Sequence, residues 1–382
     1  MIDLRSGKPI LALGLMSGTS MDGIDAALMM TDGEGELGFA GSGFAPLGDG
    51  TVSAARAIMA DWAAHRPARS QGARATLAAA ERGILMDHAH AVIDTIGNAG
   101  LPGVAVIGFH GQTVAHAPDA GWTWQIGDGA ALARLLNRPV VWDFRSADMA
   151  AGGEGAPLAP FYHFALARHI GARAPIAFLN IGGVGNVTWI DPAKDGPEEP
   201  GALIAFDTGP GNALVNDWMT QQTGAALDQD GAMAAGGRVH RDRLSSNAAR
   251  HFLDRTPPKS LDRNEFSGVL RAMEGLATAD GAATLTAFTA ECVAASLTHM
   301  PAPPTRWLIC GGGRHNRTMM GMLADRLGAP VDPVEAVGLD GDMLEAQAFA
   351  YLAVRVLRGL PTSAPGTTGC TAPVSGGRIS RP

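Results

Sequence analysis

Short apolar runs alternate with longer amphipathic stretches along most of this chain. The first apolar run, Ile10 to Leu15, is separated from a second, Ile24 to Met30, by a polar turn that contains glycine. This pattern predicts two strands that return on each other. A later alanine-rich stretch, Thr76 to Ile96, carries apolar residues at helical spacing and predicts a long helix. Strands that alternate with helices are typical of α/β layers.

Two β-branched runs follow in the first part of the chain, which extends to about residue 172. Gly103 to Phe109 predicts a strand that ends at His110-Gly-Gln-Thr113, and Arg138 to Phe144 predicts another that ends in Arg145. Residues 146–160 are rich in Gly, Ala and Pro. They predict an ordered loop before a helix that begins near Phe161.

The same pattern restarts after residue 172. Ile176 to Asn180 and Val187 to Ile190 predict a second pair of strands around a glycine turn, and Leu203 to Phe206 predicts a third strand. The two halves share no obvious sequence identity, so the repeat is one of pattern. Two halves that open in the same way predict two similarly folded domains that face a central cleft.

The C-terminal part adds one strand and two helices. Trp307 to Cys310 predicts a strand that runs into three glycines and a helix over residues 316–327. The last predicted helix covers residues 342–358, and the tail beyond Pro361 predicts loop because it contains few bulky apolar residues. We assign residues 1–172 and about 345–382 to domain I, and residues 173–344 to domain II.

Composition narrows the class of protein. Apolar residues make up 46% of the 382 residues and charged residues 17%, which is typical of a globular protein. The formal charge of −8 argues against a surface that binds nucleic acid. No apolar stretch approaches the roughly 18 residues of a membrane span, and the N-terminal residues do not resemble a signal peptide. The three cysteines form no CxxC pair, so we expect no disulfide framework and a cytoplasmic location.

The turn between the first two apolar runs has residue types that suit a phosphate group. It is Ser17-Gly-Thr-Ser-Met-Asp-Gly-Ile-Asp25. Glycine lets backbone N–H groups approach a phosphate closely, and the hydroxyl groups add donors. Asp22 is suited to a Mg²⁺ shell, either directly or through water. An ordinary hairpin turn is the alternative interpretation.

Asp207 is the strongest candidate for a catalytic group. It follows a four-residue apolar run and precedes Thr-Gly-Pro-Gly-Asn212, so we expect its carboxylate at the end of a strand. A carboxylate held in a fixed position can act as a general base. The alternative is that Asp207 caps the N-terminus of the next helix, which is a frequent use of aspartate.

Two further groups of residues have more than one interpretation. His110 and His116 are expected in one loop, where their spacing is poor for a metal and where they either bind a polar ligand or serve packing. Three tryptophans, at positions 122, 124 and 142, are expected in the core, and an aromatic face under a sugar is the alternative. The glycines at 311–313 stand between a strand and a helix, which is a common nucleotide position.

Taken together, these segments resemble the anhydro-N-acetylmuramic acid kinase family, which belongs to the sugar kinase and actin superfamily. The resemblance covers nearly the whole chain and its segments occur in order. They are residues 17–25, 110–113, 125–128, 143–145, 152–158, 180–186, 206–212 and 310–313. The resemblance implies an α/β fold with two RNase H-like domains, as in actin-like ATPases, that face a central cleft.

The resemblance also implies a role for each segment. Asp207 would be the catalytic base, and Asp22 would lie near Mg²⁺. The ATP-binding residues would be Gly18, Thr19, Ser20, Met21, Asp22, Gly23, Ile24, Asp25, Asn180, Gly182, Gly183, Gly311, Gly312 and Gly313. The sugar-binding residues would be His110, Gln112, Thr113, Gln125, Asp128 and Arg145.

The implied substrate is 1,6-anhydro-N-acetylmuramic acid, a fragment of recycled cell wall. Its O6 is tied to the anomeric carbon and carries no proton, so an ordinary sugar-kinase base would have nothing to abstract. In the implied reaction a carboxylate activates water, the water attacks the anomeric carbon, and O6 takes the γ-phosphate of ATP. The resemblance further implies a cytoplasmic homodimer that uses a small sugar and ATP and binds neither nucleic acid nor membrane.

Two segments depart from the family pattern. Glu154 stands where the family often has Gln, and the run from Lys259 to Glu265 is one residue longer than usual. It is therefore open whether Arg263 or Glu265 takes the usual place. The alternative functions are a kinase of another anhydrosugar, such as levoglucosan, and a nucleotide-binding regulator without kinase activity.

Overall fold

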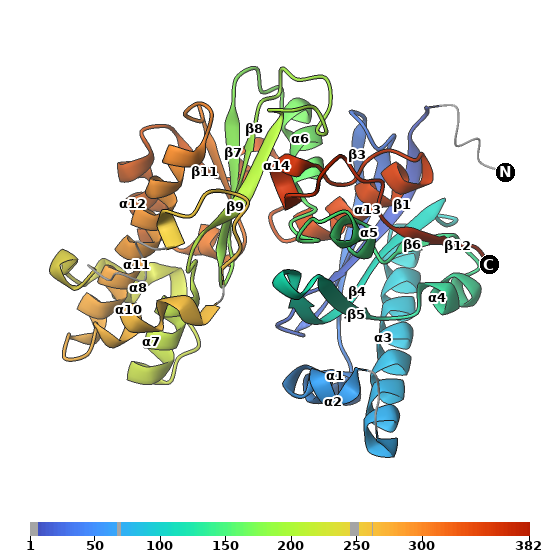
Figure 1. The fold of residues 1–382 in the computed structure, drawn as a ribbon, viewed down its shortest axis with the longest axis horizontal. Helices are drawn as coiled ribbons and strands as arrows, with labels where there is room; N and C mark the ends of the chain where they lie inside the picture. The colour runs from blue at the N-terminus through green and yellow to red at the C-terminus, as the bar shows by residue number, and fades with distance from the viewer. Residues whose placement is uncertain (1–6, 67–69, 245–251, 262) are drawn as a thin grey trace. The chain divides into compact units, whose positions relative to one another are not determined.

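The computed structural model describes residues 7–66, 70–244, 252–261 and 263–382, and the chain divides into two compact units. Unit 1 consists of Met1–His169, Gly196–Glu198 and Met343–Pro382, and unit 2 consists of Ile170–Asp195 and Glu199–Asp342. Figure 1 shows each unit as a sheet with helices packed against it. Among the helices of the described residues, none is long and apolar enough to cross a membrane.

The sheet of unit 1 is built around the strand that leads into the first glycine turn. Its strands are β1 (Ile10–Ser17), β2 (Gly23–Thr31), β3 (Leu37–Pro46), β4 (Val106–Ala117), β5 (Trp122–Ile126), β6 (Val140–Trp142) and β12 (Arg378–Ser380). Their order is β12-β6-β4-β1-β2-β3, with β5 paired to β4. β1, β2 and β3 are antiparallel neighbours, whereas β4 runs parallel to both β1 and β6.

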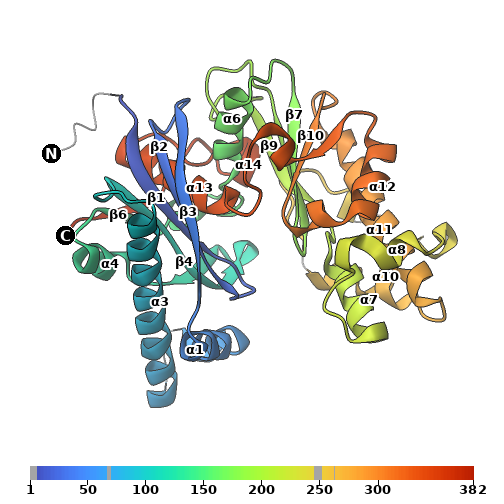
Figure 2. The ribbon, with the colours of Figure 1, turned by 180° about the vertical axis from the view of Figure 1, so that it is seen from behind.

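Helices cover both faces of this sheet (Figures 1 and 2). The helices of unit 1 are α1 (Asp49–Ala60), α2 (Trp62–His65), α3 (Gln71–Asn98), α4 (Gly129–Leu136), α5 (Ser146–Ala150), α6 (Pro160–His169), α13 (Leu344–Leu357) and α14 (Pro365–Thr368), with a 3₁₀ turn at Pro118–Ala120. Leu13, Leu15 and Phe109 pack into a core with residues of α3. Because successive strand residues point to opposite faces, the residues between them face α13 instead.

Two glycines allow α13 to lie directly on the sheet. A Cβ atom on Gly14 would stand 1.9 Å from the carbonyl oxygen of Ala346, and one on Gly108 would stand 2.1 Å from that of Phe349. Any side chain at either position would therefore displace the helix backbone. The first strand, the fourth strand and the last long helix of the chain thus form one packed core.

Unit 2 repeats this sheet order. Its strands are β7 (Ile176–Ile181), β8 (Gly185–Ile190), β9 (Leu203–Gly209), β10 (Trp307–Cys310) and β11 (Val331–Pro333), in the order β11-β10-β7-β8-β9. The first three are antiparallel neighbours, and β10 is parallel to both β7 and β11. A strand order of 3-2-1-4-5 with this pattern of directions is the RNase H-like sheet. Both units have it, so the predicted α/β fold class is confirmed.

The helices of unit 2 follow β9 and flank β10. They are α7 (Ala213–Thr223), α8 (Ala232–Ala235), α10 (Ser267–Arg271), α11 (Thr278–Ala295) and α12 (Arg317–Leu327). Short 3₁₀ turns lie at Gln229–Gly231, Arg241–Arg243, Arg263–Phe266, Ser296–His299, Gly312–His315 and Val334–Val337. α11 is buried along most of its length because it packs against α7, α8, α12 and β9.

Several local expectations are wrong. His110-Gly-Gln-Thr113 does not follow a strand but lies inside β4, which continues to Ala117, so His110 and His116 share a strand and not a loop. Residues 146–150 form α5 where a loop was expected. The C-terminal tail is not all loop, since it supplies α14 and the edge strand β12. β3 and α1 were not predicted from the sequence.

A short piece of the β8–β9 connection belongs to unit 1. Glu198 forms an ion pair with Arg355 of α13, with 2.9 Å between Oε2 and Nη2. The side chain of Arg355 is 2% exposed, and it also donates to the backbone oxygen of Gly33 at 2.9 Å. A buried guanidinium is costly unless it is paired, so this contact holds residues 196–198 against α13.

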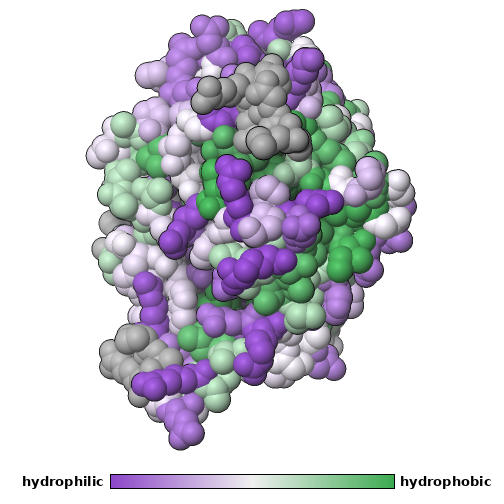
Figure 3. Space-filling view, turned by 90° about the vertical axis from the view of Figure 1, so that its right-hand side faces the viewer, coloured by the Kyte–Doolittle hydropathy of each residue, from purple (hydrophilic) through white to green (hydrophobic). Residues whose placement is uncertain are grey.

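Exposed apolar side chains are scattered over unit 1. Figure 3 shows a face on which green apolar residues are interspersed with purple polar ones. Large apolar side chains of this unit that are exposed include Met30, Phe39, Phe44, Leu135 and Ile379. Single exposed apolar residues are normal for a globular protein and indicate no function by themselves.

Candidate functional site

The first glycine turn connects β1 to β2 and presents unpaired backbone N–H groups. Met21 adopts φ of 57°, and its N–H donates to the oxygen of Gly18 at 3.2 Å. Within the described residues, the N–H groups of Thr19, Ser20 and Asp22 have no backbone acceptor. Thr19 and Ser20 are exposed, whereas the side chains of Met21 and Ile24 are buried and leave only their backbone for a ligand. The turn can therefore receive an anion through its amides.

Asp22 is the exposed carboxylate of this turn. Its Oδ1 accepts from the hydroxyl of Ser20 at 2.8 Å and from the N–H of Gly23 at 3.1 Å. Among the described residues, no group of three or more His, Cys, Asp or Glu side chains could hold a metal by itself. Mg²⁺ commonly takes one or two carboxylates and completes its shell with water and phosphate oxygens. The hard oxygen donors around Asp22 fit that kind of site.

Gln112 lies directly beneath the turn. It is fully buried, it stands opposite Ser17 in the parallel β1–β4 pair, and its Nε2 donates to the oxygen of Gly18 at 3.1 Å. Neither Gln112 Oε1 nor Ser17 Oγ has a partner among the described residues. Gln112 thus supports the turn through its amide nitrogen, and the sugar-binding role that the sequence pattern gave it stays a prediction.

His110, which is buried, and Arg145, which is half-buried, form a hydrogen-bonded pair. Nε2 of His110 accepts from Nε and Nη2 of Arg145 at 3.2 and 2.8 Å, and Nδ1 lies 2.8 Å from the oxygen of Gly111. These contacts require the proton on Nδ1. Burial, and then the charge of Arg145, hold the pKa of His110 well below its usual value, so this ring is neutral. Burial lowers the pKa of Arg145 to about 10, so the guanidinium stays charged at neutral pH.

Arg145 is held by neutral groups and keeps free donors. Its Nη1 donates to the oxygen of Gly155 at 2.7 Å. The contacts to His110 and Gly155 use three of the five N–H groups of the guanidinium, which leaves two for a ligand. The surface salt bridge that was the alternative for Arg145 is not among the ion pairs of the described residues.

The other predicted sugar-binding residues lie on the β4–β5 pair and after it. Gln125 donates through Nε2 to the hydroxyls of Thr123 at 2.8 Å and Thr113 at 3.3 Å. Oδ1 of Asp128 accepts from the N–H groups of Ala130 and Ala131, both at 2.9 Å, and so caps α4. Asp128 thus has a structural role in this fold.

A cavity of about 170 Å³ lies beside His110 and Gln125 within unit 1. Its lining includes His110, Gln125, Trp124, Trp142 and Asp143. Trp124 and Trp142 are half-buried, so they contribute both to the core and to the cavity wall. Trp122 instead packs on Trp62 and Arg66. The cavity has the polar groups and aromatic walls that suit a small sugar.

A buried carboxylate shapes the loop beside Arg145. Asp148 is 1% exposed; its Oδ2 accepts from the N–H of Gly155 at 2.7 Å and its Oδ1 from the hydroxyl of Thr368 at 2.7 Å and from that of Ser363. The loop that carries Glu154 is therefore fastened to the C-terminal segment. No sequence signal marked Asp148, because the two hydroxyl groups that bind it are more than two hundred residues away.

The second glycine turn, in unit 2, is packed against the start of α7. The N–H groups of Asn212 and Ala213 donate to the oxygens of Gly182 and Gly183 at 2.8 and 3.1 Å. Those bonds engage the carbonyl oxygens of the turn. The N–H groups of Gly182 and Gly183 have no backbone acceptor among the described residues. This turn can also offer amides to an anion.

Asp207 belongs to a row of polar residues across the sheet of unit 2. In the strand register Asn180 stands opposite Asn186, and Asn186 stands opposite Asp207, so the three side chains project from the same face. β9 continues past Asp207 to Gly209, and Asn212 occupies the N-cap of α7. Asp207 therefore does not cap that helix, and the structural alternative for this residue is wrong.

The carboxylate of Asp207 is half-buried and fixed from one side. Its Oδ2 accepts from the N–H of Leu261 at 2.8 Å, and its own N–H donates to the oxygen of Lys259 at 3.0 Å. A backbone N–H favours the charged form of a carboxylate and also limits its rotation. The residues that do this are 52 to 54 positions away in sequence, and the motif around Asp207 gives no sign of them.

The predicted nucleotide segment lies beside a cavity of about 540 Å³ in unit 2. Gly312 lines this cavity, together with Asn212, Asn216, Asp230 and His315, which the sequence analysis did not single out. Arg314 of the same 3₁₀ turn is buried and forms ion pairs with Glu335 and Asp342 at 2.8 and 2.7 Å. A pocket of this size, with few charged groups, suits a nucleoside.

Most of the predicted residues thus fall into groups within each unit. Unit 1 brings together the turn 18–25 with Gln112, and the pair His110–Arg145 with Gln125. Unit 2 brings together Asn180, the turn 182–183, Asp207 and the glycines 311–313. Glu345, in the first turn of α13, is an exposed carboxylate close enough to Arg145 to affect its pKa, and the sequence analysis missed it.

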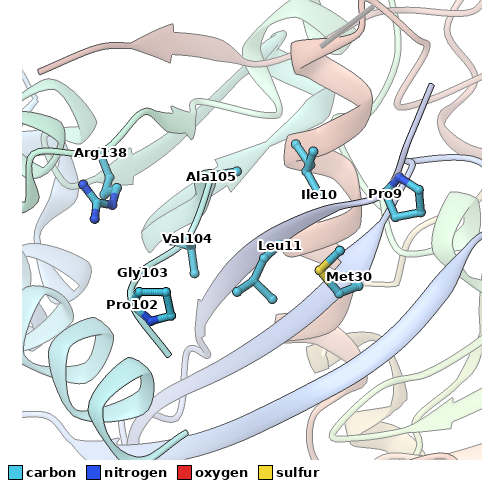
Figure 4. A pocket seen from close by; sticks show the side chains of 9 residues that line it. All are labelled: Pro9, Ile10, Leu11, Met30, Pro102, Gly103, Val104, Ala105 and Arg138. Atoms are coloured by element: carbon cyan, nitrogen blue, oxygen red, sulfur yellow. The ribbon is translucent and has the colours of Figure 1, made fainter. Parts of the chain in front are cut away.

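Unit 1 also has a depression of about 410 Å³, which is larger than its cavity beside His110. Figure 4 shows that Pro9, Leu11, Met30 and Val104 line it, with Arg138 at one side. Pro9, Leu11 and Val104 stand at the N-terminal ends of β1 and β4, whereas the glycine turn and His110 lie toward the C-terminal ends. In sheets of this kind ligands bind at the carboxyl ends of the parallel strands, so we place the candidate site there.

Comparison with known proteins gives matches over nearly the whole chain. The family profile described as Anhydro-N-acetylmuramic acid kinase matches residues 10–381. A protein of that name from Ruegeria sp. (strain TM1040) is 52% identical over 378 residues, which are 99% of this chain and 96% of the relative. Another of that name, from Roseobacter denitrificans, is 53% identical over 374 residues, 98% of this chain and 95% of the relative.

A solved structure of similar architecture is component A of the (R)-2-hydroxyglutaryl-CoA dehydratase of Acidaminococcus fermentans. It is 12% identical, with a TM-score of 0.48, and the match covers 91% of this chain and 98% of that chain.

Proposed function

This chain belongs to the anhydro-N-acetylmuramic acid kinase family, and from that premise we propose how its residues perform the reaction. The enzyme opens the 1,6-anhydro ring of 1,6-anhydro-N-acetylmuramic acid with water and transfers the γ-phosphoryl group of ATP to O6. The product is N-acetylmuramic acid 6-phosphate, an intermediate of peptidoglycan recycling.

Asp207 is the general base of this proposal. Its carboxylate takes a proton from water as the water oxygen bonds to the anomeric carbon. The bond between that carbon and O6 then breaks, and O6 bonds to the γ-phosphorus as ADP leaves. The observation that carries this role is the hydrogen bond from Leu261 N–H to Oδ2, which orients a half-buried carboxylate. A positioned base contributes about 10²–10⁴ in rate.

The two glycine turns bind the phosphate chain of ATP. The amides of Thr19, Ser20 and Asp22 serve in unit 1 and those of Gly182 and Gly183 in unit 2. Preorganised amides stabilise the charge that spreads over the phosphoryl oxygens in the transition state. Mg²⁺, held near Asp22 directly or through water, would neutralise charge on the phosphates when it is bound.

Unit 1 provides the sugar side and unit 2 the adenosine side. The two free N–H groups of Arg145 match the lactyl carboxylate of the substrate, because a guanidinium pairs with a carboxylate through two parallel hydrogen bonds. Gly311, Gly312 and Gly313 line the adenosine. The boundaries of domains I and II follow this division, with residues 1–172 and about 345–382 in one and residues 173–344 in the other.

The decisive test is the reaction of Asp207→Asn in ¹⁸O-labelled water. The parent enzyme should place the label on the anomeric carbon of the product, since ring opening uses solvent. The Asn variant should bind ATP in isothermal titration but release almost no ADP when sugar is added. Unlabelled product from the parent, or substantial turnover by the variant, would refute the base role.

A panel of anhydrosugars tests the substrate. Turnover of 1,6-anhydro-N-acetylmuramic acid should far exceed that of levoglucosan, which lacks the N-acetyl and lactyl groups. We further propose a cytoplasmic homodimer, and light scattering of the purified protein checks its mass. A monomer mass under assay conditions would refute the dimer.

A further inference from the structure

Lys259 is a buried lysine close to the catalytic carboxylate. It is 6% exposed, and its Nζ lies 3.2 Å from the oxygen of Phe252, 3.0 Å from the oxygen of Leu253 and 3.4 Å from Nε2 of His299. An ammonium group has three donors and no acceptor. The two carbonyl oxygens accept from two of these donors, and Nε2 of His299 faces the third and accepts it when that nitrogen carries no proton.

Aromatic rings complete the surroundings of this ammonium. Nζ lies 4.8 Å from the ring centre of Phe252 and 5.7 Å from that of Phe206. Phe206 precedes Asp207 in β9. A cation above an aromatic face is attracted to it, more strongly when both are removed from water. The ammonium thus ties the end of one loop to the strand that carries the catalytic residue.

The backbone of the same loop contacts Asp207 on both sides. The oxygen of Lys259 accepts from the N–H of Asp207 at 3.0 Å, and the N–H of Leu261 donates to Oδ2 of Asp207 at 2.8 Å. A shift of residues 259–261 would alter both bonds together. What holds Lys259 in place consequently also holds the carboxylate.

We infer that Lys259 is a positioning residue, whose ammonium fastens residues 252–261 to β9 and thereby sets the orientation of the Asp207 carboxylate. This inference rests on the proposed function, in which Asp207 is the base. Lys259 itself has no free donor left for a substrate and acts through the loop.

The charge on Lys259 titrates near neutral pH. Burial, followed by the nearby charge of Arg255, lowers its pKa to about 8, while Cys292, Asp254 and Asp207 act in the opposite direction. Among the described residues, His299 is a further titratable neighbour, and its Nε2 also lies 3.0 Å from the oxygen of Leu253. With a neutral lysine, Nε2 can carry the proton and donate to that oxygen. Above about pH 8 the neutral amine keeps only two donors and loses the charge that attracts it to the rings of Phe252 and Phe206, so the attachment weakens and turnover should fall on the alkaline side.

Three variants separate positioning from packing. Lys259→Met should lower kcat roughly 100-fold, the size expected for a misplaced catalytic group, with sugar KM and nucleotide affinity within about twofold of the parent. Lys259→Arg keeps a charge that does not titrate, so it should retain part of the activity and lose the alkaline decline. Lys194→Met, a lysine of the same unit that pairs with Glu199 near the surface, is the matched control and should behave like the parent.

Hydrogen exchange measures how well residues 252–261 are held in place without depending on turnover. The peptide that contains Leu261 should exchange faster in Lys259→Met than in the parent or the control. The inference is overturned if exchange of this peptide is unchanged in Lys259→Met. It is also overturned if the decline of turnover near pH 8 persists in both the Met and the Arg variants. If Asp207→Asn keeps its turnover, the proposed function fails instead, and the exchange result alone then decides whether Lys259 fixes the Asp207 carboxylate.

Discussion

Gly311 offers a quantitative test of how the nucleotide segment is built. It adopts φ of 70° and ψ of 175°, a conformation that is essentially restricted to glycine. A Cβ atom at this position would stand 2.2 Å from Oδ1 of Asn180 and 2.8 Å from the oxygen of Ile181. Gly311→Ala must therefore strain its own backbone and push away the strand that leads into the second phosphate turn.

The two costs can be estimated separately. A non-glycine residue in this conformation costs about 1–3 kcal/mol, and overpacking against a rigid neighbour costs about 1–3 kcal/mol more. A total near 3 kcal/mol in a unit of roughly 150–250 residues lowers Tm by about 6–12 °C. Because Asn180 and Gly311 both belong to the proposed ATP site, nucleotide affinity should fall as well.

Gly312 supplies a matched control from the same triplet. A Cβ atom there would meet no heavy atom within 4 Å, and its φ is not positive. Calorimetric scans of the full chain without nucleotide should show a lower Tm for Gly311→Ala, while Gly312→Ala stays within about 2 °C of the parent. Exchange of the β7 and β10 amides locates the change in unit 2. Equal melting of the two variants would refute the reasoning.

Three further predictions follow from unit 1. Burial lowers the pKa of His88 from 6.5 to about 4. The neutral ring therefore contributes fully to stability above about pH 6.5, and about 3 kcal/mol of that stability is lost as the pH falls toward 4. The Tm of His88→Leu should depend less steeply on acid pH than that of the parent, and identical Tm profiles would contradict this. Arg145→Met should raise sugar KM about 10–100-fold and leave ATP affinity unchanged in titration; Lys at this position should not restore binding. Asp148→Asn should destabilise unit 1 by about 3 kcal/mol and accelerate hydrogen exchange in the loop after α5. Protection of that loop equal to the parent would disprove this.

The strands around the two glycine turns could be predicted because their signals are local. Apolar runs such as Ile10 to Leu15 and Ile176 to Asn180 are bounded by turn residues within a few positions. The continuation of β4 through His110 to Ala117 could not be predicted, since this segment is polar and becomes a strand by pairing with β5. β12 depends in the same way on the exposed edge of β6.

The candidate site shows the same division. Asp22 and Asp207 stand out because each follows or precedes an apolar run within a glycine-rich segment. The partners that orient them do not stand out, since Leu261 approaches Asp207 from 54 positions away. Gln112 is a second example, because its motif gave no sign that its amide supports Gly18, which is 94 positions away in sequence. The sequence pattern thus identifies residues with suitable chemical groups, but the tertiary contacts determine the role of each group.

The contact of α13 with Gly14 and Gly108 bears on how the polypeptide matures during translation. Strands at the beginning of the sequence cannot bury their inner face until residues beyond 343 have left the ribosome. Unit 2, apart from three residues, is continuous and can complete its sheet earlier. We therefore expect nascent chains truncated before Leu344 to expose apolar strand surface to chaperones, and full-length synthesis to end that exposure.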